Sequence, residues 1–267
     1  MTNIDVRDFW DAAACGEAAY AVGGTSADRF AAQRETRYKL EPFIAPFANF
    51  VAATNRDVLE IGVGMGADHE QWARKSPRKL CGIDLTPHGI DLTSERLSLY
   101  GLSSELQVAD AEALPFPDAN FDIVYSWGVL HHSNDTQQAI NEVARVLRPK
   151  GQARIMIYHR YSFVGALLWL RYGRFCRSLT SVYAEHLESP GTKAYSYVEA
   201  KAMIENSGLE VVAMHTELSP GDLLTGDAGQ RHKGAALSIL RKIWPRKTIR
   251  TMGRRLGLFL LIEAEKP

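Results

Sequence analysis

Short apolar runs alternate with amphipathic stretches along most of this chain. Seven of these runs have the composition and the flanking turn residues of β-strands. Most are almost continuously apolar, which is typical of strands buried on both faces of a sheet. Because helical patterns separate the first five runs, the chain is expected to form a doubly wound α/β sheet. The predicted strands are 57–62, 79–84, 105–110, 121–127, 153–158, 209–215 and 258–265.

The clearest helix is the stretch DTQQAINEVARVL at 135–147. Asp135 is suited to cap its first turn, and Gln138 stands three residues later in the position of a capping box. Pro149 and Gly151 mark its end. The apolar residues of this helix fall on one stripe, which predicts a single buried face. The stripe consists of Ile140, Val143, Ala144 and Leu147.

Three segments do not fit the simple alternation of strands and helices. Residues 1–50 predict a helical cap before the main domain, 51–267, which carries insertions at 159–195 and 216–255. Additions at the carboxyl ends of the strands usually build or cover a pocket, so we expect 1–30 and 159–195 to form a lid. Gly23 and Gly24 suit a hinge in this lid. The alternatives for 159–195 are a helix that only packs over the sheet and, after it, contact with a membrane surface.

The composition adds limits to this picture. The chain has 267 residues, of which 46% are hydrophobic and 23% charged, as in ordinary globular proteins. Cys15, Cys81 and Cys176 lie far apart without CxxC spacing, which indicates reduced thiols and a cytoplasmic protein. The first residues lack the pattern of a signal peptide, and the longest apolar run, 163–170, is too short to span a bilayer.

Glycines follow the first predicted strand in the stretch VLEIGVGMGAD. Gly62 and Gly64 permit a tight turn and leave backbone amides open to a ligand. The helix that follows offers its N-terminal amides to an anionic group. Gly62, Gly64 and Ala67 also satisfy the pattern G-x-G-x-x-G/A, and Asp84 ends the second strand, where a carboxylate can accept ribose hydroxyls. These features predict a nucleotide-type site but leave NAD and other adenosine cofactors open.

The end of the third predicted strand separates these cofactors. The stretch VADAEALPFPDANFDIVYSWGVLHH, together with EIGVGMG, GIDL and EVARVLRPKG, resembles the class I S-adenosylmethionine-dependent methyltransferases. The small-molecule group that includes the ubiquinone and menaquinone methyltransferases is the most similar. The resemblance covers about residues 55–160. It implies a seven-stranded sheet in the order 3-2-1-4-5-7-6, with the seventh strand antiparallel and helices on both faces.

The resemblance also assigns parts of the cofactor to single residues. The three glycines would line the methionine part of S-adenosylmethionine, Glu60 would hold its ammonium, and Asp84 would accept its ribose hydroxyls. The glycines are Gly62, Gly64 and Gly66. The other assigned residues are Asp110 and Ala111 at the adenine, Ser126 and Trp127 near the methionine and the methyl group, and Leu85 and Glu112 as further cofactor contacts.

Methyl transfer needs a general base only where the acceptor must lose a proton. His131, His132 and His159 follow predicted strands at their carboxyl ends and are the candidates for this base. The alternative is that His131 or His132 only orients its loop. No acid stands in ligand register with these histidines, so we expect no metal. The expected acceptor is a small apolar or aromatic metabolite; a nicotinamide oxidoreductase and a non-methylating cofactor-binding protein are the alternatives.

A basic tract lies between residues 231 and 255. It holds nine Lys or Arg residues and no Asp or Glu. Arg231, His232 and Lys233 are expected to reach the pocket and meet an anionic group of the acceptor. The later cations would face a carrier protein, another subunit or an anionic membrane, and a solvated face is the alternative. No pattern favours nucleic acid. The later cations are Arg246, Lys247, Arg250, Arg254 and Arg255.

Overall fold

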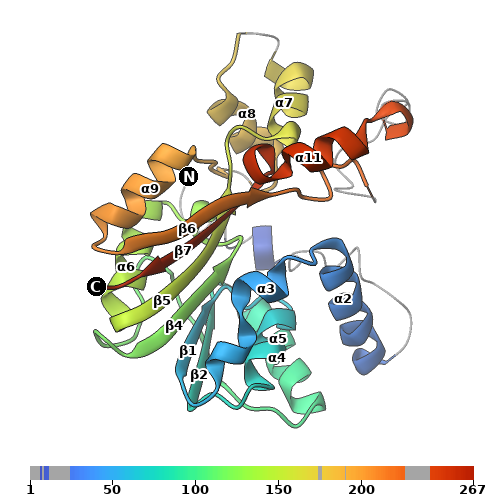
Figure 1. Ribbon diagram of the computed structural model, residues 1–267. Coiled ribbons are helices and arrows are strands. Elements are labelled where there is room, and N and C mark those ends of the chain that lie inside the picture. Colours follow the sequence, from blue (N-terminus) through green and yellow to red (C-terminus); the bar gives the residue numbers. More distant parts are fainter. Residues whose placement is uncertain (1–6, 8, 12–24, 174–175, 190, 226–240) are drawn as a thin grey trace.

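The computed structural model describes residues 7, 9–11, 25–173, 176–189, 191–225 and 241–267. Within these ranges seven strands form one sheet in the order β3-β2-β1-β4-β5-β7-β6 (Figure 1). The pairs among β1 to β5 are parallel, whereas β7 is antiparallel to both β5 and β6. This confirms the sheet that the resemblance implied. The strands are β1 Asp57–Ile61, β2 Lys79–Asp84, β3 Glu105–Val108, β4 Phe121–Trp127, β5 Leu147–Tyr158, β6 Glu210–Glu217 and β7 Phe259–Glu265.

The seven predicted strands all form, and two of them, β2 and β4, have the predicted bounds. The prediction was wrong at the start of β5, which begins at Leu147 rather than at 153. Leu147 pairs with Phe121 of β4, and the far end of the chain adds two further hydrogen bonds. The Lys150 N–H donates to the carbonyl of Lys266, and the Lys266 N–H donates to the carbonyl of Gly151. These bonds extend the strand past Pro149.

Helices cover both faces of the sheet (Figure 1). On one face, Phe47 and Trp72 pack with Tyr125 of β4, and on the other, Ile140 and Ile204 pack with strand residues such as Val124. The first face carries α3, α4 and α5, and the second carries α6 and α9. The bounds of these helices are α3 Ile44–Ala48, α4 Ala67–Ala73, α5 Pro87–Leu99, α6 Thr136–Val146 and α9 Tyr197–Asn206. Short 3-10 turns lie at Phe50–Ala53 and Leu130–His132.

The start of α6 combines a confirmed and a corrected prediction. Asp135 caps the helix, because its carboxylate accepts from the N–H of Gln138 at 3.0 Å. Gln138 does not complete the capping box. Its side-chain amide donates to the carbonyl of Glu112 at 3.3 Å, and the carboxylate of Glu112 accepts the Asp135 N–H at 3.1 Å. A residue from the loop after β3 thus replaces the expected local partner.

The three additional segments contribute the remaining helices. They are α2 Ser26–Leu40, α7 Phe163–Leu168, the π-helical turn Trp169–Gly173, α8 Leu179–His186 and α11 Arg246–Leu256. The buried carboxylate of Asp222 joins the second and third segments to the sheet, because it accepts from the N–H groups of Val164, Ser219 and Leu258. The Gly23–Gly24 hinge and Cys15 lie outside the described residues, whereas Cys81 and Cys176 are free thiols. No described helix has both the length and the apolar character needed to cross a membrane.

Candidate active site

A cavity of about 260 Å³ opens at the carboxyl edge of the parallel strands. The last residues of four strands form its wall, namely Ile61 of β1, Asp84 of β2, Trp127 of β4 and Tyr158 of β5. Phe259, the first residue of β7, closes one side. Because carboxyl ends of neighbouring parallel strands meet at one edge, residues far apart in sequence face the same space.

The glycine loop forms one wall of this cavity, and its glycines are needed for two different reasons. Gly64 has φ +50° and no atom within 4 Å of where a Cβ would stand, so the backbone conformation requires it. A Cβ on Gly62 would lie 2.1 Å from Cγ2 of Val129. Gly62 therefore lets the loop after β4 pack closely against the loop after β1.

Asp84 and Asp110 line the neighbouring part of the wall. The carboxylate of Asp84 accepts from the N–H of Gly64 at 2.9 Å and from the hydroxyl of Thr86 at 2.8 Å. These bonds fix the orientation of the carboxylate. Asp110 accepts from the N–H of Glu112 at 2.9 Å. Each carboxylate oxygen can accept more than one hydrogen bond, so both acids retain capacity for a ligand.

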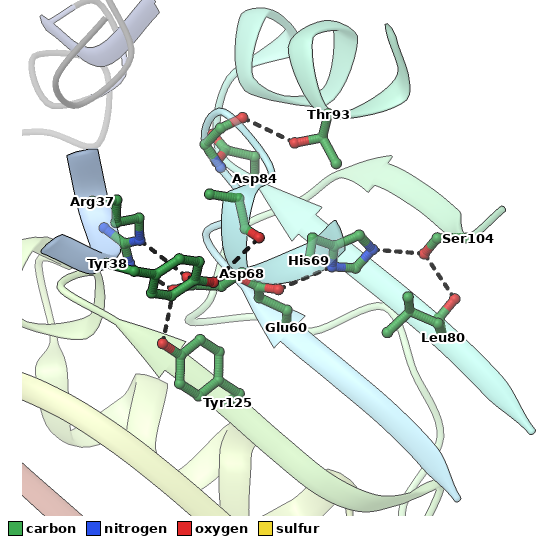
Figure 2. Close-up of polar contacts among 12 residues, drawn as sticks. Arg37, Tyr38, Glu60, Asp68, His69, Leu80, Asp84, Thr93, Ser104 and Tyr125 are labelled. Carbon is green, nitrogen blue, oxygen red and sulfur yellow. Dashed lines mark hydrogen bonds and ion pairs between the residues drawn. The ribbon is translucent and has the colours of Figure 1, made fainter. Parts of the chain in front are cut away.

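A buried carboxylate at the start of α4 anchors α2 beside the cavity. Figure 2 shows Arg37, Tyr38 and Tyr125 converging on Asp68. Arg37 donates to both oxygens of Asp68, from Nε at 3.0 Å and from Nη2 at 2.6 Å. The hydroxyls of Tyr38 and Tyr125 each donate at 2.8 Å. Burial raises the pKa of Asp68, but Arg37 and these hydroxyls more than offset that, so the pKa lies below its usual value.

Two other carboxyl groups in the wall are held closer to their neutral form. Burial, reinforced by the charge of Asp68, raises the pKa of Glu60 well above its usual value. Burial also raises the pKa of Glu41 to about 7, although Arg37 opposes this shift. Negative charges that share a desolvated site repel one another, and protonation of Glu60 and Glu41 removes this repulsion. A bound cation would remove it in the same way.

Acidic groups dominate the charge of the whole wall. Among the described residues that line the cavity, six are carboxylic acids, whereas Arg37 is the one Lys or Arg. Arg37 is already paired with Asp68. The cavity is therefore built to receive positive charge. The six acids are Glu41, Glu60, Asp68, Asp84, Asp110 and Glu188.

Of the three candidate histidines, His132 is the one in the cavity wall. Its Nδ1 lies 2.8 Å from Oγ of Ser189, and its Nε2 lies 3.5 Å from Oε2 of Glu188. His131 is fully buried behind it, with its ring centroid 4.1 Å from that of Tyr158 and the two rings tilted. Burial lowers the pKa of His131 well below its usual value.

His159 lies outside the cavity wall, as do two of the residues assigned to the cofactor. The His159 ring is buried, 5.2 Å from the ring of Tyr197, and burial lowers its pKa. Glu112 serves the start of α6, and the hydroxyl of Ser126 is buried beneath the wall. The other assigned residues line the cavity: Glu60, Gly62, Gly64, Gly66, Asp84, Leu85, Asp110, Ala111 and Trp127.

The structure also adds wall residues that the sequence pattern did not single out. They are Trp10, Arg37, Glu41, Asp68 and Glu188. Asp68 carried a usable signal, because it begins a polar run, Asp68 to Glu70, directly after the glycine loop. The others lie on segments whose position depends on tertiary packing. In the described part of the chain, no group of His, Cys, Asp and Glu is arranged to hold a metal ion.

Residues 59–155 match the family model of a methyltransferase domain. This stretch of the chain carries a methyltransferase domain. Two relatives are the methyltransferase GfsG of Streptomyces halstedii, 27% identical over 64% of this chain, and the fatty-acid O-methyltransferase of Mycolicibacterium smegmatis, 41% identical over 35%. The chain spans 58% and 34% of the lengths of these two proteins.

A solved structure extends the likeness beyond the matched methyltransferase domain. It is a putative methyltransferase of Haloferax volcanii, determined in complex with the activator Trm112. Its TM-score is 0.60 at 19% sequence identity, and the alignment covers 92% of this chain and 100% of that one. At this identity the likeness concerns the fold alone.

Proposed function

We propose that this chain transfers the methyl group of S-adenosylmethionine to a small apolar or aromatic acceptor, on oxygen, nitrogen or carbon. The observation that carries the proposal is the acidic composition of the cavity wall, with six carboxylic acids against one arginine among the described residues. S-adenosylmethionine brings a sulfonium, an ammonium and a carboxylate, and so has a net positive charge. NAD brings two phosphates, which these acids would repel.

The wall offers a partner for each polar part of S-adenosylmethionine. Glu60 would accept from the ammonium, and Arg37, which is already fixed by Asp68, would meet the carboxylate. Asp84 would accept the ribose hydroxyls and Asp110 the adenine amino group. When bound, the cofactor supplies an electrophilic methyl group, and the residues of this chain orient it and exclude water.

The acceptor end of the proposed site is apolar. Trp127, Met156, Tyr158 and Phe259 line it, with His132 beside them. Such a surface favours an apolar or aromatic molecule, and the name of the fatty-acid O-methyltransferase relative agrees with that.

Hydrogen bonds around His132 suit a general base. The hydroxyl of Thr192 donates to the carbonyl of Ser189, so the hydroxyl of Ser189 can donate to Thr192 and accept from Nδ1 of His132. This arrangement satisfies all three contacts and leaves Nε2 of His132 with a lone pair. Nε2 can then take a proton from an acceptor, and Glu188, 3.5 Å away, stabilises the imidazolium.

Calorimetry tests the cofactor directly. S-adenosylhomocysteine should bind and NAD should not, because only the former carries the ammonium that the acids attract. Binding of NAD alone would overturn the proposal in favour of an oxidoreductase. A tight S-adenosylhomocysteine complex without methyl transfer to phenols, fatty acids or activated carbon acids would favour the non-methylating alternative.

The proposal extends to the surroundings of the cavity. We infer that α2 and the segment 159–195 cover the site; support comes from Gln33 and Arg37 of α2 and from Glu188, which line the cavity. The described part of the basic tract, 241–255, is proposed to contact an anionic carrier protein or membrane. Arg231, His232 and Lys233 lie outside the described residues. A cytoplasmic location is supported by the free thiols of Cys81 and Cys176.

A further inference from the structure

A chain of buried polar groups leads away from the cavity behind Glu60. Oε2 of Glu60 lies 3.0 Å from Nδ1 of His69, and Nε2 of His69 lies 2.8 Å from Oγ of Ser104 (Figure 2). Ser104 in turn donates to the carbonyl of Leu80 at 2.9 Å. The ring of His69 is fully buried and does not line the cavity. It therefore touches Glu60 from the side opposite to a ligand.

The order of these contacts fixes where the protons are. A carbonyl can only accept, so the single hydroxyl hydrogen of Ser104 is used by Leu80. Oγ of Ser104 must then accept from Nε2–H of His69. The remaining contact, between Nδ1 of His69 and Oε2 of Glu60, also needs a hydrogen. Either a protonated carboxyl donates to a neutral ring, or an imidazolium donates to a carboxylate, and the pair is neutral in both cases.

Strand β2 makes room for this ring. A Cβ on Gly82 would lie 2.7 Å from Cε1 of His69, so a larger residue there would displace the imidazole. Burial lowers the pKa of His69 to about 3, against the charge of Asp68. Burial raises the pKa of Glu60; Asp68 and Asp84 add to this effect, and Arg37 opposes it. Burial thus favours the uncharged form of both groups, which corresponds to the shared proton on Glu60 in the ligand-free protein.

We propose that His69 is a positioning residue that takes the proton of Glu60 when an ammonium group binds in the cavity. The O–H bond of Glu60 breaks and an N–H bond forms at Nδ1 of His69, while the ammonium keeps its three hydrogens. Glu60 then meets the ligand as a carboxylate, and no proton leaves the protein. The inference rests on the proposed function, because the methionine part of S-adenosylmethionine supplies the ammonium.

Nitrogen-15 NMR of histidine-labelled protein tests this transfer, since ring shifts distinguish a neutral Nε2–H ring from an imidazolium. S-adenosylhomocysteine should convert His69 from the first form to the second. 5′-Methylthioadenosine, which has the same nucleoside and thioether but no amino group, should bind and leave the ring neutral. His69→Gln assigns the signal. An imidazolium already present without ligand, or a ring that stays neutral with S-adenosylhomocysteine bound, would overturn the inference. Failure of S-adenosylhomocysteine to bind would instead overturn the proposed function.

Calorimetry in buffers of different ionisation enthalpy gives a second readout. The wild-type protein should bind S-adenosylhomocysteine without exchanging a proton with the buffer. In His69→Gln, Glu60 has no neighbour to take its proton, so about one proton should be released. The same variant should bind S-adenosylhomocysteine about tenfold more weakly and 5′-methylthioadenosine almost unchanged. Equal weakening of both ligands without proton release would mean that His69 only fills space.

Discussion

Asp68 shows how one buried carboxylate can organise a site. Its two oxygens accept four hydrogen bonds, two from Arg37 and one each from Tyr38 and Tyr125. Because a buried charge is tolerated only when it is paired and hydrogen-bonded, this set of partners keeps Asp68 ionised. Arg37 is thereby held rigidly in the cavity wall. Glu60 has a histidine as its partner instead, and its raised pKa favours the protonated, neutral form.

Replacing Asp84 tests the ribose contact at the level of one side chain. Asp84→Ala should weaken binding of S-adenosylmethionine by about 1–3 kcal/mol, because two hydroxyls lose a charged acceptor. Isothermal titration of the folded variant measures this. Asp91→Ala, on an exposed position of α5, is the matched control and should bind normally. Unchanged affinity in Asp84→Ala would mean that the ribose binds elsewhere.

The buried His131 should make the stability of the protein depend on pH. Its pKa is lowered in the folded state, and neither ring nitrogen has a hydrogen-bond partner among the described residues. The unfolded chain therefore binds more protons below pH 6.5, and the contribution of His131 to stability is lost as the pH falls through that value.

The loss should be about 1.4 kcal/mol for each pH unit below 6.5. His131→Phe keeps an aromatic ring against Tyr158 and should reduce this slope, as followed by urea unfolding at pH 7.5 and 5.5. His215→Gln, on a partly exposed position of β6, serves as the control. A slope that His131→Phe leaves unaltered would assign the pH dependence to other groups.

At the scale of elements, charge pairs join α2 to the domain. Glu70 of α4 is fully buried and contacts Arg34 of α2 and Arg96 of α5, and Arg96 also donates to the carbonyl of Phe30 in α2. Asp68 supplies the second attachment. Helix α2 is therefore fixed to the cofactor-binding helices by polar contacts as well as by apolar ones. Such contacts can loosen when one partner is removed.

Removing the charge of Asp68 should loosen α2 more than the rest of the molecule. In Asp68→Asn we expect amide exchange in 26–40 to speed up at least about tenfold, while α6 is unaffected. Glu95→Gln breaks a pair between α2 and α5, but that pair, Arg29–Glu95 at 3.6 Å, is partly exposed and should matter little. Hydrogen exchange with mass spectrometry measures both. Equal protection of α2 in Asp68→Asn and wild type would mean that Asp68 does not hold α2 to the domain.

Elements encoded by a local pattern can be predicted from the sequence, whereas those that depend on distant segments cannot. The strands were predictable because each is a local run of apolar residues, and β2 and β4 have the predicted bounds. The start of β5 was not predictable, since it depends on pairing with Phe121 of β4 and on Lys266 at the far end of the chain. The glycine loop and Asp84 are local features and were found. Arg37 and Glu188 reach the cavity through the packing of whole segments, for which no local pattern exists.

Over the whole molecule, the two kinds of charge are separated. Acids gather in the cavity, whereas 241–255 carries seven Lys or Arg residues and no acid. Helix α11 packs on the sheet through Ile249 and Gly253 and exposes Met252 among its cations. An exposed basic face with apolar residues suits an anionic surface. Because of this separation, the basic outer face can attract an anionic partner while the acidic cavity attracts a cationic ligand.

Charge reversal on α11 tests this outer face. Arg250→Glu should reduce cosedimentation with vesicles rich in anionic lipid, and the difference from wild type should fade at high salt because exposed charges are screened. Lys75→Glu makes the same charge change at a partly exposed position after α4 and should have little effect. Loss of binding to an acidic carrier protein, with no vesicle binding in the wild type, would identify a protein partner. Wild-type protein that binds neither would mark 241–255 as a solvated face.

The acidic wall has a consequence for turnover as well as for binding. Under the proposed function, departure of the methyl group turns a positively charged sulfonium into a neutral thioether, while the carboxyl groups of the wall stay where they are. The attraction that captured the substrate thus weakens at the moment the reaction is complete. Product release is then favoured by the chemistry itself, and inhibition by accumulated S-adenosylhomocysteine should be weaker than in a site whose wall carries no net charge.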